Sequence, residues 1–381
     1  MLPPRSNGAD YLFMEIPLSC RRGIFALIAV SIMKLRRRKL VLVLLLLGGS
    51  LVASLSLASA FGAVDIPLPD ILKIALNKLA IFDFPATWRG VEETIILQVR
   101  LPRVIGGALV GSALATAGVL FQGLLRNPMA DPYIIGTSAG AALGATIAMS
   151  LPINLAFLSF GLVPVAAFCG ALATVFLVYN LARVEGKTPI VSMLLAGVVV
   201  SSLMAAIVAL LMSISDRLQL NLHSVYSFLM GHISVTSWEQ IAIIAPLVIG
   251  GVIGARFFVF QLNAFSLGEE GAGYLGIEVE RDKILILALG SLLTAAAVSI
   301  SGLVGFVGLV VPHAVRLSFG PDHKLLLPAS ALAGAAFVVI ADLLARVLLA
   351  PVELPVGVIT AIIGAPFFIY LLRHTRKEYA L

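Results

Sequence analysis

Few residues of this 381-residue sequence could do chemistry, and the clearest are three arginines at the edges of apolar runs. Arg100 and Arg103 flank Pro102 where one run begins, and Arg346 lies near the end of another. A guanidinium is always charged and holds a carboxylate through paired hydrogen bonds. The pattern therefore indicates carboxylate binding. The alternatives are lipid headgroups and, for Arg346, the side chain of Asp342 one turn earlier.

A second charged stretch, residues 262–283, reads LNAFSLGEEGAGYLGIEVERDK and is too polar for the interior of a membrane. Its four glutamates are Glu269, Glu270, Glu278 and Glu280. The run from Leu267 to Leu275 predicts a short surface helix that ends at Gly276, because glycine readily ends a helix. An ordinary solvated loop is the alternative interpretation.

Patterns of catalytic and metal-binding residues are missing from the sequence. The five histidines are scattered, and Cys20 and Cys169 lie in different segments. There is no nucleophile elbow, no zincin motif and no P-loop. We therefore predict no catalytic residue, metal site or cofactor, so the chain is not expected to be an enzyme.

The composition indicates an integral membrane protein. Hydrophobic residues make up 60% of the chain and charged residues 12%, and the mean hydropathy is +1.06. A membrane-crossing α-helix needs about 20 mainly apolar residues, and the sequence offers many such runs without the alternation of a membrane barrel. The predicted fold class is all-α, a polytopic membrane protein in contact with lipid.

Ten spans are predicted, of which the eighth is too short to cross alone. We expect that span to be a half-buried helix completed by a polar turn around VPHAVRLSFGPDHK. The predicted spans are Leu40 to Phe61, Leu101 to Leu124, Ile134 to Leu151, Phe160 to Leu181, Pro189 to Ile214, Trp238 to Phe260, Ile284 to Leu303, Val304 to Val315, Leu325 to Leu349 and Val356 to Leu372.

The distribution of basic residues predicts the orientation, because positively charged loops stay in the cytoplasm. With both termini cytoplasmic, only seven of the 26 basic residues fall in outer segments. This assignment places residues 62–99 outside and the polar stretch at 262–283 inside. The net charge of +6 thus reports topology, and it gives no support for nucleic-acid binding.

The segment LLRNPMADPYIIGTSAGAALGA, residues 124–145, predicts a tight turn followed by a closely packed helix. Its two prolines end the incoming helix, and Asp131 is placed to cap the outgoing one. The small residues that follow let another helix approach, which is how helices associate in lipid. The preceding span has the same character, with glycines at 106, 107, 111 and 118.

Residues 1–39 are predicted to be an N-terminal extension that is cytoplasmic or poorly ordered, ahead of a membrane domain at 40–381. The apolar stretch at 23–33 is too short to span and is flanked by basic residues. Met33, followed by KLRRRK, is typical of the start of a first span.

Four separated blocks of the sequence resemble one family. They are RLPRVIGGALVGSALATAGVLFQGLLRNPMADPYIIGTSAGA at 100–141, LGEEGAGYLGI at 267–277, GLVGFVGLVVPHAVRL at 302–317 and ADLLARVLLAPVELPVGVITAIIGAPFFIYLL at 341–372. They look like the permease subunits of bacterial ABC importers for iron(III)-siderophores, haem and cobalamin, the FecCD/BtuC type. The likeness begins near residue 40. It implies a type II ABC importer permease fold in the cell (inner) membrane.

The resemblance also implies partners and residue roles. The family's permease is a homodimer that works with two cytoplasmic ABC ATPase subunits and one external or periplasmic substrate-binding protein. By this likeness Arg100, Arg103 and Arg346 dock the binding protein, and the surface helix couples to the ATPase. The coupling residues are Leu267, Gly268, Glu269, Glu270, Gly273, Leu275 and Gly276. The residues of the pathway or gate are Asn127, Met129, Ile190 and Val191, for which packing is the alternative role.

Two other classes of protein are less consistent with the sequence. An ion-coupled secondary transporter is expected to carry carboxylates near the membrane midplane, yet the acidic residues lie almost wholly in loops, with Asp342 the main exception. A membrane enzyme needs clustered His, Asp or Cys. The family resemblance implies import of an iron chelate, either a siderophore complex or haem, with cobalamin as the alternative substrate.

Overall fold

The computed structural model describes residues 18–62, 66–78, 84–85, 88–151, 160–218 and 220–375. It divides into two compact units, residues 1–46 and residues 47–381. The first unit contains the N-terminal part of α1 (Leu18–Ala60), and the second contains all the other helices. Of the predicted extension, residues 1–17 lie outside the described residues. From Leu18 onward the backbone is helical, so the apolar stretch at 23–33 belongs to α1.

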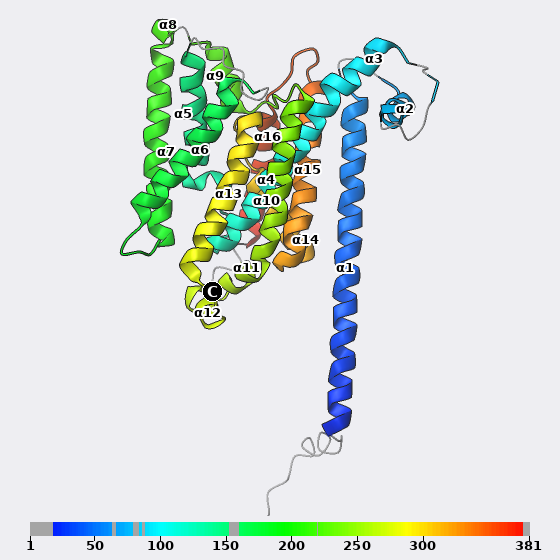
Figure 1. Cartoon of the computed structure of the whole chain (residues 1–381), viewed down its shortest axis with the longest axis vertical. Coiled ribbons are helices and arrows are strands. Elements are labelled where there is room, and N and C mark those ends of the chain that lie inside the picture. Colours follow the sequence, from blue (N-terminus) through cyan, green and yellow to red (C-terminus); the bar gives the residue numbers. More distant parts are fainter. Residues whose placement is uncertain are drawn as a thin grey trace, which may run out of the picture. The chain divides into compact units, whose positions relative to one another are not determined.

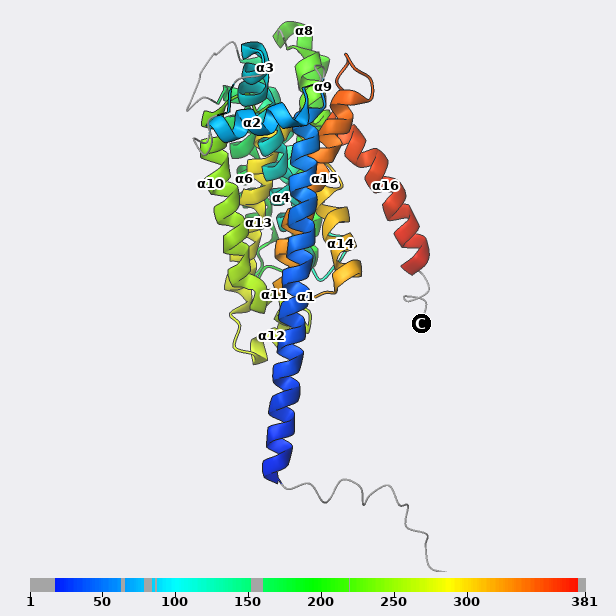
Figure 2. The ribbon, with the colours of Figure 1, turned by 90° about the vertical axis from the view of Figure 1, so that its right-hand side faces the viewer.

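Helices make up the second unit, and within the described ranges there is no β-strand, only an isolated bridge between Val184 and Lys187. Figures 1 and 2 show the helices from two sides. After α1 they are α2 (Leu68–Lys78), α3 (Gly90–Thr94), η1 (Ile95–Arg100), α4 (Leu101–Leu124), η2 (Pro132–Ile135), α5 (Thr137–Ser150), α6 (Leu162–Ala182), α7 (Ile190–Ser213), α8 (Ser215–Leu218), α9 (Leu222–Met230), α10 (Trp238–Ala255), η3 (Arg256–Phe258), α11 (Val259–Phe265), α12 (Glu269–Tyr274), α13 (Val279–Ser301), α14 (Val307–Phe319), α15 (His323–Val347) and α16 (Val356–Thr375).

The all-α membrane fold is confirmed. Each of the ten predicted spans corresponds to a helix or to a run of joined helices. Among the described residues, seven helical stretches are long and apolar enough to cross a membrane. The other three predicted spans are the shorter helices α5, α14 and α16.

The third span is shorter than predicted, because the stretch from Ile134 to Leu151 is not one helix. Gly136 has a φ of 88° between the 3-10 helix η2 and the 14-residue α5. Such a left-handed residue interrupts the helical hydrogen bonding, and glycine adopts it without a steric penalty. A 14-residue helix is about 21 Å long, less than the roughly 30 Å hydrocarbon core.

The eighth span is short, as predicted, but its polar end is mostly helical. α14 continues from Val307 through the histidine and arginine of VPHAVRLSF to Phe319. Only Gly320, Pro321 and Asp322 separate it from α15, and the Asp322 side chain caps α15 by accepting from the N–H of Lys324 at 3.0 Å. The predicted turn is therefore three residues long.

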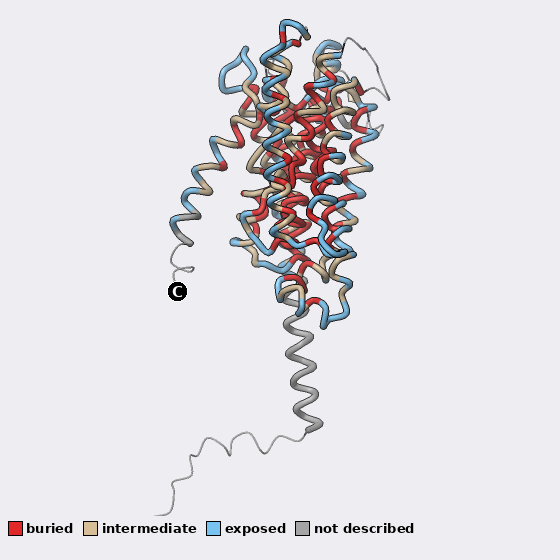
Figure 3. Tube along the Cα trace, turned by 90° about the vertical axis from the view of Figure 1, so that its left-hand side faces the viewer, coloured by how far each residue is buried: buried red, intermediate tan, exposed pale blue. Residues whose placement is uncertain are grey.

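Helix α4 forms the centre of the bundle and packs against α10, α13, α14 and α15. Figure 3 shows buried residues gathered in this region. In the most apolar part of the span that contains α4, 78% of the residues are buried. In the corresponding part of α7, only 17% are buried. Close approach is possible because Gly111 faces the carbonyl of Gly334 and Gly118 faces that of Gly308, where a Cβ would overlap backbone. The predicted small-residue packing is confirmed.

A second group of helices, α5, α6 and α7, packs beside this centre. Gly140 and Gly144 of α5 lie against backbone atoms of α6, so the small residues after the 124–132 turn also serve close packing. Asp131 accepts a hydrogen bond from the N–H of Tyr133 at 2.8 Å, and it therefore caps η2 and not the following α-helix.

Several short helices were not anticipated. α2 and α3 lie in the predicted outer segment 62–99, and α8 and α9 precede α10. The polar stretch 262–283 is also more helical than predicted, because α11 enters it, α12 occupies its middle and α13 begins at Val279. α12 lies at one end of the bundle and α8 and α9 lie at the other (Figure 1).

Candidate functional site

Arg103, in the first turn of α4, joins two carboxylates that are distant in sequence. Its Nε donates to Oδ1 of Asp342 at 3.1 Å, and its Nη2 lies 3.0 Å from the same oxygen. Its Nη1 donates to Oε2 of Glu353 at 2.9 Å and to Oε1 at 3.2 Å. Arg103 therefore ties α4 both to α15 and to the loop that precedes α16.

Asp342 is the centre of this arrangement, because a second arginine approaches its other oxygen. Arg346, one turn later on α15, donates from Nε to Oδ2 at 3.0 Å. The Asp342 side chain is only 2% exposed. A buried carboxylate is stable only when opposite charges and hydrogen bonds compensate it, and here two guanidinium groups do so.

The end of α1 supplies the remaining partners of the arginines. Arg100 donates from Nη1 to the carbonyls of Ser59 and Ala60 at 2.9 and 3.0 Å, and Arg346 donates from Nη2 to that of Ala58 at 3.0 Å. The last carbonyls of a helix have no partner within it and carry partial negative charge. We call Arg100, Arg103, Arg346, Asp342 and Glu353 the arginine cluster.

The arginine cluster corrects one part of the sequence interpretation. Arg100 and Arg346 are 6% and 9% exposed, so their side chains are turned into the protein and not toward lipid headgroups. The alternative pairing of Arg346 with Asp342 is confirmed. Binding-protein docking by these three arginines stays a prediction. The sequence analysis did not identify Glu353. The only sign of it was that Glu353 is the single charged residue in the apolar segment PVELP.

His232 lies beside the arginine cluster in the segment between α9 and α10. Its backbone N–H donates to the carbonyl of Ser301 at 2.8 Å. Burial lowers the pKa of His232, and the positive charge of Arg103 lowers it further, against the opposing effect of Glu353 and Asp342. Burial and Arg103 together therefore disfavour a positive charge on His232.

The predicted surface helix is present as α12, within the stretch of coupling residues. Gly268 precedes it with a φ of 97°, and Gly276 follows it with a φ of 82°. Ala272 is fully buried, whereas Glu270 and three large apolar side chains are exposed. The three apolar side chains are Leu267, Tyr274 and Leu275, at 69%, 90% and 50%. Large apolar side chains grouped at a polar surface are typical of a contact with another protein.

The glutamates of this stretch have different surroundings. Oε1 of Glu269 lies 2.9 Å from Nζ of Lys283, and that nitrogen is also 2.9 Å from Oε1 of Glu280. Glu278 pairs instead with Arg281 at 3.4 Å, where both side chains are well exposed. The lysine is buried, with 9% of its side chain exposed. We call Lys283, Glu269, Glu280 and Thr188 the lysine network.

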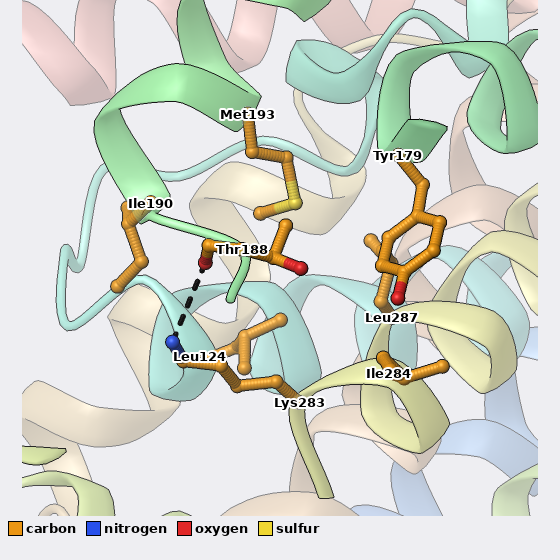
Figure 4. A pocket seen from close by; sticks show the side chains of 8 residues that line it. All are labelled: Leu124, Tyr179, Thr188, Ile190, Met193, Lys283, Ile284 and Leu287. Carbon is orange, nitrogen blue, oxygen red and sulfur yellow. Dashed lines mark hydrogen bonds between the residues drawn. The ribbon is translucent and has the colours of Figure 1, made fainter. Parts of the chain in front are cut away.

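The four predicted pathway residues lie in two places. Asn127 Oδ1 accepts from the N–H of Met129 at 2.9 Å, which closes the turn after α4. Ile190 and Val191 begin α7, where Val191 is 77% exposed and Ile190 lines a small pocket (Figure 4). Within the described residues, no hydrogen bond or ion pair joins the turn residues Asn127 and Met129 to Ile190 and Val191. Their role as a gate stays a prediction.

The turn after α4 approaches α12. Arg126 has a φ of 51°, and its Nη1 would lie 3.4 Å from a Cβ placed on Gly268. The turn containing Asn127 and Met129 therefore lies close to the start of α12, so that two of the predicted functional segments share one end of the bundle.

The chain is similar to proteins of one transport family. A family model described as the FecCD transport family matches residues 50–374. The cobalamin import system permease protein BtuC of Halobacterium salinarum is 47% identical over 287 residues, covering 74% of this chain and 75% of that protein. The hemin transport system permease protein HmuU of Yersinia pestis is 44% identical over 292 residues, covering 74% of this chain and 84% of that protein.

A solved structure of a metal-chelate type ABC transporter in an inward-facing conformation is similar in fold as well as in sequence. It aligns with a TM-score of 0.74 and 30% identity, covering 87% of this chain and 98% of that chain. PsaBC from Streptococcus pneumoniae, at 18% identity and a TM-score of 0.52, is similar in fold alone.

Proposed function

Because this chain belongs to the FecCD transport family, we propose that it is the membrane-spanning permease subunit of an ATP-driven importer. The observation that carries the proposal is the match of the family model over residues 50–374, together with the similarity to a metal-chelate type ABC transporter over 98% of that chain. The sequence has no P-loop, so the energy of ATP reaches this chain from a separate subunit.

The ATPase contacts the chain at α12. The exposed side chains of Leu267, Tyr274 and Leu275 form an apolar surface that a groove of a partner can cover. Gly268 and Gly276, both with positive φ, form turns at the two ends of α12 and separate it from α11 and α13. This end of the bundle is then cytoplasmic, which agrees with the distribution of basic residues. The same distribution supports a multi-pass protein of the cell (inner) membrane with both termini in the cytoplasm.

The binding protein docks at the opposite end of the bundle, over the arginine cluster. Three arginines face two carboxylates there, so the cluster keeps a surplus positive charge that an acidic side chain of the binding protein can approach. Arg103 is the most accessible of the three, with 14% of its side chain exposed, and its partner Glu353 is 44% exposed. Contacts of this kind steer association and fix orientation more than they add affinity.

A second copy of the chain completes the transport pathway. α7 carries exposed apolar side chains that recur every four residues: Val191, Leu195, Val199 and Leu203. In a homodimer such a face can line a weakly interacting path for a large substrate, with Ile190 and Val191 at its cytoplasmic end. An apolar constriction closes a pathway by excluding water.

The substrate is a large chelate, either a siderophore complex or haem, with cobalamin as the alternative. The haem permease of Yersinia pestis is 44% identical to this chain and the cobalamin permease of Halobacterium salinarum is 47% identical. These values are too similar to rank the substrates. We place the iron chelates first because they are more widespread in the family.

Reconstitution tests this function. The chain, co-purified with its ATPase, is placed in liposomes with the binding protein, and uptake of a ferric siderophore, haem and cobalamin is followed with ATP and with a non-hydrolysable analogue. We expect ATP-dependent accumulation of one of the three. Accumulation driven by a proton gradient without the ATPase would instead support the secondary-transporter alternative.

A further inference from the structure

The side chain of Lys283 contacts both α12 and the segment before α7. Its Nζ lies 2.9 Å from a carboxylate oxygen of Glu269, the first residue of α12. The same nitrogen lies 2.9 Å from Glu280 and 3.4 Å from the carbonyl oxygen of Thr188. An ammonium has three donors, and this arrangement gives each of them an acceptor.

Glu280 makes the second half of the connection. While Oε1 accepts from Lys283, Oε2 accepts from the backbone N–H of Thr188 at 3.0 Å. Thr188 precedes Pro189, which restricts the threonine to an extended conformation, and α7 begins at the next residue, Ile190. A displacement of Thr188 is therefore passed directly to the first turn of α7.

α12 is a short helix between two turns. The helix is six residues long, and Gly268 and Gly276, both in conformations that favour glycine, flank it. The ion pair between Glu269 and Lys283 is thus a direct tie from α12 to a helix that crosses the membrane.

We propose that Lys283 is a positioning residue that transmits the position of α12 to the first turn of α7. The inference rests on the proposed function, in which α12 receives the ATPase and Ile190 and Val191 form part of the gate. A movement of α12 displaces the ammonium, and the shared contacts with Glu280 carry the displacement to Thr188 and α7.

Figure 4 shows the side chains around the start of α7. The stem of Lys283 lines a small pocket there with Thr188, Ile190, Met193 and Tyr179. Leu124, the last residue of α4, lines the same pocket, so Lys283 and the first turn of α7 meet beside the end of α4.

The test measures substrate taken up per ATP hydrolysed by the reconstituted complex. Lys283→Met, Glu269→Gln and Glu280→Gln are each expected to lower this ratio about tenfold, as for residues that couple two sites. Because the contacts act in series, the double variant Glu269→Gln/Glu280→Gln is expected to be no lower than Lys283→Met. Lys283→Arg keeps the positive charge and is expected to restore most of the ratio.

Arg281→Met is the matched control, since Arg281 lies on the same helix and pairs with Glu278 at the surface. It is expected to keep the parent's ratio. If Lys283→Met yields too little assembled complex, Glu269→Gln and Glu280→Gln test the inference instead. Both replaced side chains are partly exposed, and glutamine keeps the shape of glutamate, so these variants are expected to assemble.

Three outcomes are distinguishable. A parent complex without ATP-dependent uptake contradicts the proposed function, and the inference with it. A parent complex with uptake, but with unchanged ratios in the glutamine variants, overturns the inference alone. Effects of the two glutamine substitutions that multiply in the double variant also overturn it, since they would show two independent structural roles and no relay.

Discussion

The arginine cluster and the lysine network are both groups of charges around one buried side chain, Asp342 or Lys283, but they are built differently. The arginine cluster places three cations around two carboxylates and uses helix carbonyls as further partners. The lysine network places one cation between two carboxylates and a carbonyl. One therefore has surplus positive charge and the other surplus negative charge, at opposite ends of the bundle (Figure 1).

Solvent exposure separates them further. Asp342, at the centre of the arginine cluster, is 2% exposed, whereas Glu269 and Glu280 are 39% and 31% exposed. A fully buried carboxylate needs its partners in order to remain charged, while a partly exposed one can turn to water. We therefore expect the arginine cluster to contribute more to the stability of the fold than the lysine network.

The largest effect is expected from Asp342→Asn. The substitution leaves Arg103 and Arg346 without their shared counter-charge in a buried site, which costs about 3–5 kcal/mol of stability. The thermal unfolding midpoint of the purified chain in detergent measures the loss. Glu278→Gln, at the exposed pair with Arg281, is the control and is expected to change the midpoint little. A small loss at Asp342 would show that the cluster is not structural.

A smaller loss of stability is expected from Lys283→Met. The two glutamates that it releases are partly exposed and can be hydrated, so the cost is about 1 kcal/mol, in the range of an exposed pair. The same thermal measurement tests it beside Asp342→Asn. An equal loss in the two variants would remove the distinction between the two clusters.

Glu353→Gln is expected to strengthen docking of the binding protein, because the arginine cluster then carries more surplus positive charge. Removing this carboxylate frees Arg103 for an acidic residue of the binding protein, so affinity is expected to rise by a few-fold, roughly 1 kcal/mol or less for a partly exposed pair. Titration of the binding protein onto the complex measures it, and the gain should shrink at high salt. Weaker binding would mean that Glu353 itself contacts the partner.

The smallest effect concerns pH and His232. Its pKa is lowered in the folded chain by burial and by Arg103, so the folded state takes up the proton less readily than the unfolded state, whose pKa is about 6.5. Stability is therefore expected to fall as the pH drops below that value. His232→Gln should reduce the difference in unfolding midpoint between neutral and acidic pH. An unchanged difference would contradict the assignment.

Much of the fold was predictable from the sequence, because apolar runs and their polar boundaries are local signals. The predicted span from Leu101 to Leu124 corresponds to α4, although η1 extends it toward the N-terminus without a break, and the turn at Arg126 closes it. The surface helix near Leu267 was also predictable from its flanking polarity and glycines. The break at Gly136 was not, since the same glycine also suits a continuous, closely packed helix.

The partners of the arginines could not be predicted, because they are distant in the chain. Arg103 and Asp342 are 239 residues apart, and the carbonyl of Ser59 that binds Arg100 is 41 residues away. Only the packed bundle brings them together. Arg346 and Asp342, one helical turn apart, were the exception, because an i,i+4 pair is visible in a sequence.

One assay of both clusters tests most directly whether the arginine cluster serves docking and the lysine network serves coupling. Uptake and ATP hydrolysis are measured together in the reconstituted complex, for Glu353→Gln in the arginine cluster and Glu269→Gln in the lysine network, over a range of binding-protein concentrations. We predict that Glu353→Gln shifts the concentration of binding protein needed and keeps the uptake per ATP, whereas Glu269→Gln lowers the uptake per ATP at every concentration. If both variants change the same quantity in the same way, the two clusters do not have the separate roles proposed for them.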